Sequence, residues 1–195
     1  MIIWQKIRSG FPNPRTERRQ EIMDTAMRVF AEKGYEQTTM RDIASAVGVV
    51  PGLCYRYFES KQVLFEQAVR QYVSDYCAPI VRALKEHSGD MSSAFDRAAA
   101  LFLTSGSREK YDAFFHKEEN RTFHTLLSYS ICDYMLPFAA EFFDSLNANG
   151  TISVSDTKSF SQFILYGQIP IINDESLTPE EKAARIKEYM SKLTK

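Results

Sequence analysis

Cysteine, glycine, proline and tryptophan are scarce in this sequence of 195 residues, which holds 3, 8, 7 and 1 of them respectively. Long hydrophobic runs are missing as well. The opening stretch MIIWQKIRSGFPNP has no apolar run long enough for a signal peptide, and no later segment approaches the roughly 20 apolar residues of a membrane span. We therefore expect a cytoplasmic protein with no membrane partner.

The three cysteines, Cys54, Cys77 and Cys132, lie far apart and form no CxxC pair, which argues against a disulfide framework or a thiolate zinc site. A second possible metal set is His116, His124 and Cys132, which follow one another at intervals of eight residues. Eight residues turn a helix by about 80° from the starting direction, so these side chains diverge, whereas ligands at i and i+4 converge. We expect neither a metal site nor a cofactor.

Sequence motifs of common enzymes are also missing. The chain contains no GxGxxG, no GxxxxGK[ST], no GxSxG and no HExxH pattern, so an enzyme would need a site that these motifs do not describe. The formal net charge is only −1, yet residues 1–61 hold 10 Lys and Arg against 7 Asp and Glu, while the remainder holds 14 against 18. We expect a protein that is not an enzyme and whose mildly basic N-terminal part faces an anion.

What the sequence does contain is helical periodicity. A first helix is predicted from about Thr16, after Pro14, to Lys33 and Gly34, which together mark a helix end. Its apolar stripe recurs at helical spacing and consists of Ile22, Ala26, Val29 and Phe30. The rest of the chain has similar patterns, and we predict an all-α protein.

Two short helices follow the first. The spacing of Thr39 and Asp42 is that of a capping box and predicts the start of a second helix, which ends at Gly48. Pro51 suits the first position of a third helix, which runs to about Phe58. Two short helices joined by a Gly-containing turn form a helix-turn-helix, whose second helix enters the major groove of DNA.

The third helix has two different sides. Steps of about 100° per residue separate an apolar side, expected to dock on the protein, from a side expected to face DNA. The first holds Val50, Cys54 and Phe58, and the second holds Gly52, Tyr55 and Arg56. Glycine permits a close approach, and an arginine fork fits a guanine edge or a phosphate. The plainer interpretation is that the tyrosines are packed aromatics and the charges lie on a solvated surface.

Two stretches carry a family resemblance, VFAEKGYEQTTMRDIASAVGV and PGLCYRYFESKQVLF. Through them, residues 15 to about 72 resemble the DNA-binding domain of the tetracycline-repressor-like (TetR) family of bacterial transcription regulators. The resemblance implies a set of DNA contacts: Thr38, Thr39, Arg41, Pro51, Gly52, Tyr55, Arg56, Tyr57 and Lys61. Two departures leave the operator sequence open. Val50 stands where the family usually has Ser, and Leu53-Cys54 replace the commoner Thr/Ala-Leu pair.

The sequence thus predicts three parts: an N-terminal arm at 1–14, a three-helix DNA-binding domain at 15–60, and a larger helical domain at 61–195 for effector binding and dimerisation. Helices are predicted at 60–86, 91–105, 108–115, 121–147, 156–171 and 178–193. The arm carries Lys6, Arg8 and Arg15, which could enter a minor groove, although a loose tail is the simpler interpretation.

The last two long helices offer apolar residues at spacings of three and four, and the resemblance implies a four-helix interface in a homodimer. The expected interface residues are Phe160, Ile164, Gly167, Ile186, Met190 and Leu193. An ordinary core face is the alternative. A two-fold dimer would place two recognition helices about 34 to 36 Å apart and predicts a palindromic operator.

Aromatic residues are dense between positions 95 and 166. Core packing would explain any one of them, but together they fit an aromatic-walled pocket for a small hydrophobic effector. The expected effector-binding residues are Phe102, Tyr111, Phe123, His124, Tyr134, Phe138, Phe163 and Tyr166.

The sequence therefore predicts a homodimeric regulator, a repressor that an effector releases from its operator by moving the fourth helix. One alternative is a DNA-binding dimer that is controlled by a protein partner or has no effector. Another is a small-molecule-binding protein or enzyme without a DNA function, which salt bridges that hold Arg56 and Lys61 away from solvent would favour.

Overall fold

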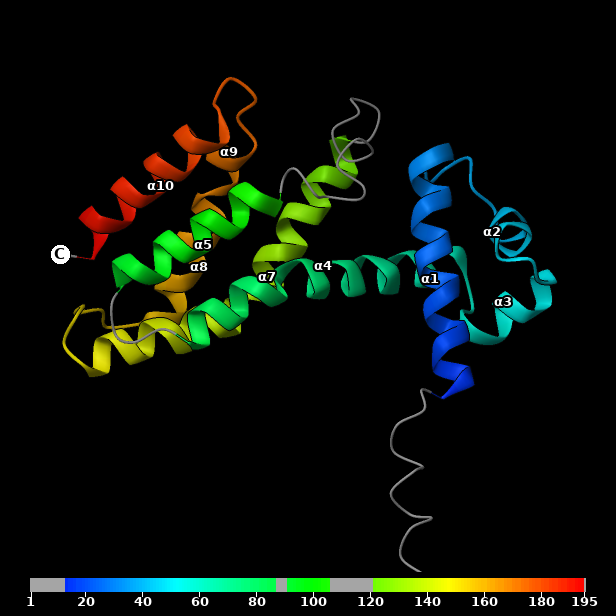
Figure 1. The fold of residues 1–195 in the computed structure, drawn as a ribbon, viewed down its shortest axis with the longest axis horizontal. Helices are drawn as coiled ribbons and strands as arrows, with labels where there is room; N and C mark the ends of the chain where they lie inside the picture. Colours follow the sequence, from blue (N-terminus) through cyan, green and yellow to red (C-terminus); the bar gives the residue numbers. More distant parts are fainter. Residues whose placement is uncertain (1–12, 87–90, 106–120, 195) are drawn as a thin grey trace, which may run out of the picture. The chain divides into compact units, whose positions relative to one another are not determined.

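The computed structural model describes residues 13–86, 91–105 and 121–194, and in those ranges every regular element is a helix. The all-α prediction is confirmed there, whereas the helix expected at 108–115 lies outside the described residues. The helices (Figure 1) are α1 (Pro14–Lys33), α2 (Met40–Val47), α3 (Pro51–Tyr57), α4 (Lys61–Lys85), α5 (Met91–Ser105), α7 (Arg121–Ala148), α8 (Thr157–Gly167), α9 (Ile169–Ile172) and α10 (Pro179–Leu193).

The chain divides into two compact units, residues 1–71 and 72–195, and the division falls inside α4. We expected it at the start of that helix. The first turns of α4 belong to the N-terminal unit because their apolar side chains are buried there. The ring of Phe65 lies 5.2 Å from that of Phe30 and 4.9 Å from that of Tyr35.

In the N-terminal unit, α1 begins and ends with local signals. The side chain of Asn13 accepts a hydrogen bond from the backbone N–H of Arg15, and Pro14 occupies the first helical position. At the other end Gly34 has a φ of +81°, a conformation that side chains with a Cβ rarely adopt. The expected stripe lies inside, since Ile22, Ala26, Val29 and Phe30 are all buried.

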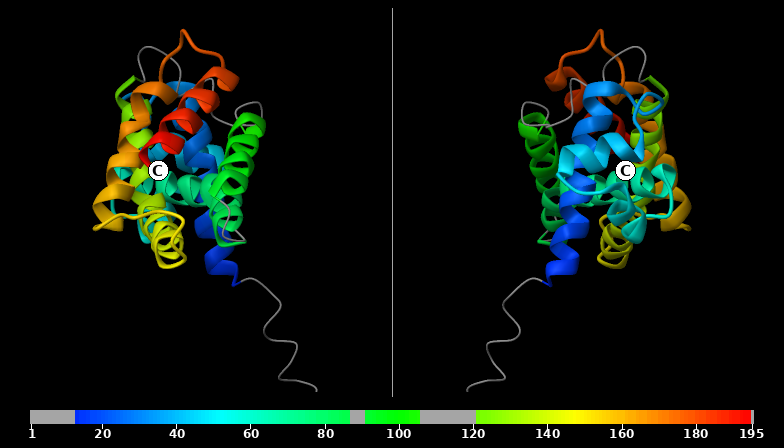
Figure 2. Two further views of the ribbon diagram at one scale, coloured as in Figure 1. Left: turned by 90° about the vertical axis from the view of Figure 1, so that its left-hand side faces the viewer. Right: turned by 90° about the vertical axis from the view of Figure 1, so that its right-hand side faces the viewer.

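In the C-terminal unit, the core forms between α5, α7, α8 and α10. Its buried residues are Ala94, Ala139, Phe142, Phe143, Leu146, Ile152, Ile164 and Met190. Helix α10 contacts α5 and lies beside it in two views (Figures 1 and 2). It starts with the predicted capping box, in which Thr178 and Glu181 each satisfy a backbone N–H of the other. Among the described helices, none has the length and hydropathy that crossing a bilayer requires.

Candidate functional site

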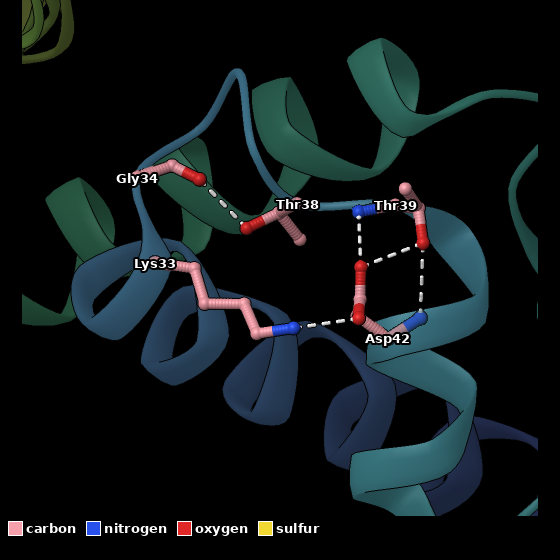
Figure 3. Close-up of polar contacts among 5 residues, drawn as sticks. All are labelled: Lys33, Gly34, Thr38, Thr39 and Asp42. Atoms are coloured by element: carbon pink, nitrogen blue, oxygen red, sulfur yellow. Dashed lines mark hydrogen bonds and ion pairs between the residues drawn. The ribbon is translucent and has the colours of Figure 1, made fainter.

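The start of α2 is held by a polar network (Figure 3). The hydroxyl of Thr39 accepts a hydrogen bond from the N–H of Asp42 at 3.2 Å, and the Asp42 carboxylate accepts one from the N–H of Thr39 at 2.8 Å. The capping-box prediction is thus confirmed. Lys33 donates to the same carboxylate at 2.6 Å and, together with Thr39, holds the pKa of Asp42 well below its usual range.

Thr38 lies in the core, unlike the other residues that the resemblance implies as DNA contacts. Its side chain is 0 % exposed, and its hydroxyl donates to the carbonyl oxygen of Gly34 at 2.7 Å (Figure 3). This hydrogen bond closes the turn between α1 and α2. The physical role of Thr38 is therefore to shape the turn that orients α2.

Helix α3 has one buried side and one exposed side, as the helical steps predicted for most of its residues. Cys54 and Phe58 are buried, whereas Gly52, Tyr55 and Arg56 are exposed, Tyr55 at 53 %. Arg56 has no ion pair within the described ranges of the chain. This exposed side is therefore available to a partner outside the unit.

Gly52 is not required by the fold. Its φ is not positive, and a Cβ built on it would meet no atom within 4 Å. An exposed glycine in a helix lowers helix stability relative to alanine. The missing side chain is consistent with a surface that another molecule approaches closely.

Val50 is the exception to the predicted sides of α3, and the prediction that it docks on the protein is wrong. Its side chain is 71 % exposed, because α3 begins only at Pro51 and the backbone of Val50 is extended, with φ −74° and ψ 144°. Helical steps therefore do not apply to this residue. The signal was present in the sequence, since proline at the first helical position places the preceding residue outside the helix.

The remaining expected contacts lie at the start of α2 and on α3. Thr39 and Arg41 are exposed at the start of α2, and Pro51 and Tyr57 are partly exposed on α3. With Gly52, Tyr55 and Arg56 they form what we call the α3 surface: Thr39, Arg41, Pro51, Gly52, Tyr55, Arg56 and Tyr57.

Lys61 is engaged within the protein, and among the described residues it forms no salt bridge. Its Nζ donates to the carbonyl oxygen of Tyr35 at 2.8 Å and to that of Glu36 at 3.4 Å, and lies 4.2 Å from the centre of the Tyr35 ring. An ammonium group has three donors, so one remains for a phosphate. At the start of α4, the hydroxyl of Ser60 accepts a hydrogen bond from the N–H of Val63 at 3.1 Å.

The C-terminal unit carries an exposed apolar groove between α8, α9 and α10, with a volume of about 360 Å³. Its lining includes five of the six residues expected at the dimer interface. The residues around it are Phe163, Ile164, Gly167, Gln168, Ile171, Ile186, Tyr189, Met190, Lys192 and Leu193. We name this feature the α8–α10 groove.

Two phenylalanines of α8 lie in surroundings that differ from those expected. Phe163, expected in an effector pocket, is 65 % exposed and lines the α8–α10 groove. Phe160, expected at the dimer interface, packs edge-on against Phe143 of the core, with ring centres 5.0 Å apart. Which side of an apolar helix faces the core depends on its neighbours, and here α7 occupies the side of Phe160.

The other expected effector residues are only partly described. Tyr111 and the side chains of Phe102 and Phe123 lie outside the described residues. Tyr134 and Phe138 have ring centres 5.5 Å apart on α7. Neither of them lines the α8–α10 groove with Phe163.

Polar partners engage several of the expected effector residues. The hydroxyls of Tyr134 and Ser74 are 3.2 Å apart. Tyr166 donates to the carboxylate of Asp133, a hydrogen bond that raises the pKa of Tyr166 to about 12. His124 is half-buried, and its carbonyl oxygen accepts from Ser128 at 3.0 Å. Each of these contacts also suits an ordinary packed helix interface.

Comparison with known proteins identifies the N-terminal unit. Residues 22–68 match the family model described as bacterial regulatory proteins, tetR family. This segment contains the whole α3 surface. The N-terminal unit holds a TetR-family domain. The family model describes bacterial regulatory proteins.

Curated relatives match less than half of this chain. The HTH-type transcriptional repressor KstR2 of Rhodococcus jostii (strain RHA1) is 41 % identical over 58 residues, which cover 30 % of this chain and 28 % of that repressor. The match therefore spans less than a third of the relative's length.

Solved structures extend the fold similarity to most of the chain. A TetR-family transcriptional regulator from Pectobacterium atrosepticum gives a TM-score of 0.64 at 19 % identity, covering 91 % of this chain and 92 % of that one. AibR in complex with isovaleryl coenzyme A and operator DNA gives 0.55 at 21 % identity, covering 87 % and 96 %. At these identities the similarity concerns the fold alone.

Proposed function

We propose that this protein is a homodimeric DNA-binding transcription regulator, a repressor that leaves a palindromic operator when a small hydrophobic or aromatic effector binds its C-terminal unit. The observation that carries the proposal is the exposed side of α3. There Gly52, Tyr55 and Arg56 face solvent, while Cys54 and Phe58 on the other side anchor the helix in the core. Such a helix can enter a major groove without rearrangement of the fold.

The proposed DNA contacts are the α3 surface and the remaining donor of Lys61. Arg56 can offer two parallel donors to a guanine edge or to a phosphate, and the tyrosine hydroxyls can donate to phosphates. Thr38 is left out, because its hydroxyl is buried and already donates to Gly34. The same surface on a second copy would meet the next turn of the duplex, about 34 to 36 Å away.

The direct test is fluorescence anisotropy of the full chain with labelled DNA from upstream of its own gene, at several salt concentrations. Binding that exceeds binding to scrambled DNA and weakens with salt supports the proposal. Arg56→Ala should weaken binding by at least tenfold, which is about 1.4 kcal/mol. The matched control is Arg97→Ala, which removes the same charge from an exposed position of α5. Equal losses in both variants would contradict a specific role for α3.

For dimerisation, the support is the α8–α10 groove. Phe163, Tyr189 and Leu193 are large apolar side chains that stay about half exposed or more in the single chain. A second copy of the chain would cover them, because an exposed apolar patch of this kind is typical of a protein interface. Size-exclusion chromatography with light scattering tests this part, since a monomer at micromolar concentration would contradict it.

For the effector, the support is the aromatic composition of the C-terminal unit and the fold shared with AibR, which was solved with isovaleryl coenzyme A and operator DNA. Acyl coenzyme A thioesters and small aromatic acids are therefore the first probes. A probe that binds the protein and lowers its operator affinity supports release by an effector. Probes that bind without any change in operator affinity would contradict the mechanism and favour a regulator without an effector.

A further inference from the structure

Of the large apolar side chains that the structure describes, Val50 is the most exposed, at 71 %. It lies at the corner between α2 and α3, next to Pro51, the first residue of α3. Single exposed apolar residues are common on protein surfaces, so exposure alone carries no conclusion. The position of Val50 in the corner makes it unusual.

Valine is a poor choice for this position on structural grounds. Val50 is the N-cap of α3, and its side chain makes no capping hydrogen bond. Serine, threonine, aspartate or asparagine at an N-cap would satisfy a free N–H of the first turn. The side chain of Val50 thus supports neither the helix nor the core, which leaves it available for a contact outside the protein.

The chemistry of valine limits what that contact can be. Its side chain has no donor and no acceptor, so it cannot hold a phosphate or a polar base edge. In the major groove, the apolar group that base edges present is the C5 methyl of thymine. The first residues of a recognition helix are those that reach base edges. Gly52, two residues later, leaves open space where a side chain would otherwise hold the duplex away.

We infer that Val50 contacts the C5 methyl group of a thymine in each operator half-site and thereby determines part of the operator sequence. This inference rests on the proposed DNA-binding function. It assigns Val50 to direct base readout, whereas Arg56 and the tyrosines can bind either phosphates or bases. The C5 methyl of 5-methylcytosine has the same chemistry, but the base that we propose is thymine.

The size of the effect follows from the burial of one methyl group. Transfer of a methyl or methylene from water to an apolar contact changes an equilibrium about fourfold. A dimer that reads two half-sites should then lose about fifteenfold in affinity when both methyl groups are removed.

The experiment starts with the full chain and random double-stranded DNA, from which the operator is selected. Each thymine of the selected site is then replaced by deoxyuridine, which removes the methyl group and keeps every hydrogen-bonding atom. We expect one symmetric pair of thymines at which replacement of both lowers the affinity of the wild-type protein for the operator by about fifteenfold. Replacement of the other thymines should change affinity less than twofold.

Two variants assign the methyl contact to Val50. Val50→Ala removes two methyl groups, and Val50→Ser removes them while adding a hydroxyl that can cap α3, so the second variant should fold at least as well as the wild type. For both variants, deoxyuridine at the symmetric pair should lower operator affinity by less than twofold. Thymine and deoxyuridine sites would then be bound almost equally.

Two outcomes would overturn the inference and leave the proposed function standing. One is tight operator binding in which no deoxyuridine replacement matters. The other is an unchanged deoxyuridine penalty in both variants, which would assign the methyl contact to another side chain. If the selection yields no preferred sequence at all, the proposed function fails, and the inference fails with it.

Discussion

Replacing Gly52 with alanine should separate folding from DNA binding, because the two make opposite demands on this position. Gly52 is the second residue of α3 and is exposed. Its backbone is not in the left-handed region, and a Cβ there would meet nothing within 4 Å. Within the protein, an added methyl group is therefore free of strain.

The effect on stability is expected to be favourable and small. Alanine is better than glycine in a helix by about 0.8 to 1 kcal/mol, and it also restricts the unfolded chain by about 0.4 to 1 kcal/mol. These figures describe the same backbone effect, so they are not added. Since Gly52 lies in the first turn, we expect Gly52→Ala to stabilise the N-terminal unit by about 0.5 kcal/mol.

The effect on DNA binding is expected to be unfavourable and larger. If α3 enters the groove with its backbone against the duplex at Gly52, the methyl group lifts the helix away and loosens the polar contacts of Tyr55 and Arg56. Loss of one good bidentate contact costs about 1 to 3 kcal/mol, which corresponds to a loss of about five- to 150-fold in affinity.

The assay has two parts that use the same protein preparation. Urea unfolding followed by circular dichroism measures the free energy of unfolding, and fluorescence anisotropy on the selected operator measures affinity. A variant that is at least as stable as the wild type and binds at least fivefold more weakly supports close approach at Gly52. Unchanged affinity in a stable variant would refute the reasoning, because a surface in close contact with DNA cannot accept the methyl group.

Three further predictions concern groups away from this position. Because its folded pKa is lowered by Lys33 and Thr39, Asp42 stabilises the N-terminal unit above pH 4, and this stabilisation should disappear as the pH falls below 4; Asp42→Asn should flatten that part of the stability profile measured by circular dichroism. Burial raises the pKa of the Cys77 thiol to about 12, so this thiol should resist maleimide labelling at pH 7 in the folded protein and react after unfolding, and rapid labelling of the folded protein would contradict its burial. Phe163→Glu should shift the dimer toward monomer in light scattering, whereas Gln162→Glu, the same charge at the next exposed position of α8, should leave it unchanged.

The N-terminal unit is the part that sequence reasoning predicted best, because local interactions mark its helix ends. The capping box of Thr39 and Asp42 is formed within four residues, and so is the one that starts α10 at Thr178. Gly34 and Gly48 end α1 and α2 with positive φ angles. Such signals need no knowledge of distant parts of the chain, so the sequence contains them completely.

Residues whose neighbours come from elsewhere in the chain were harder to place. Lys61 donates to the carbonyl oxygen of Tyr35, 26 residues earlier, so part of its hydrogen-bonding capacity serves the fold. The hydrogen bond of Thr38 to Gly34 spans only four residues, but the burial of Thr38 depends on packing against other segments. A polar side chain looks the same in sequence whether it faces solvent or a buried carbonyl.

The sequence by itself determined the helical fold of the described residues, the helix-turn-helix and the family, since all three depend on short-range spacing and capping. Only the tertiary structure decided that α4 divides between two units and that Phe163 and not Phe160 lines the α8–α10 groove. The physical reason is that an amphipathic pattern specifies that one side of a helix is buried. Which partner covers that side, and where it ends, depends on the packing of segments that are distant in the chain.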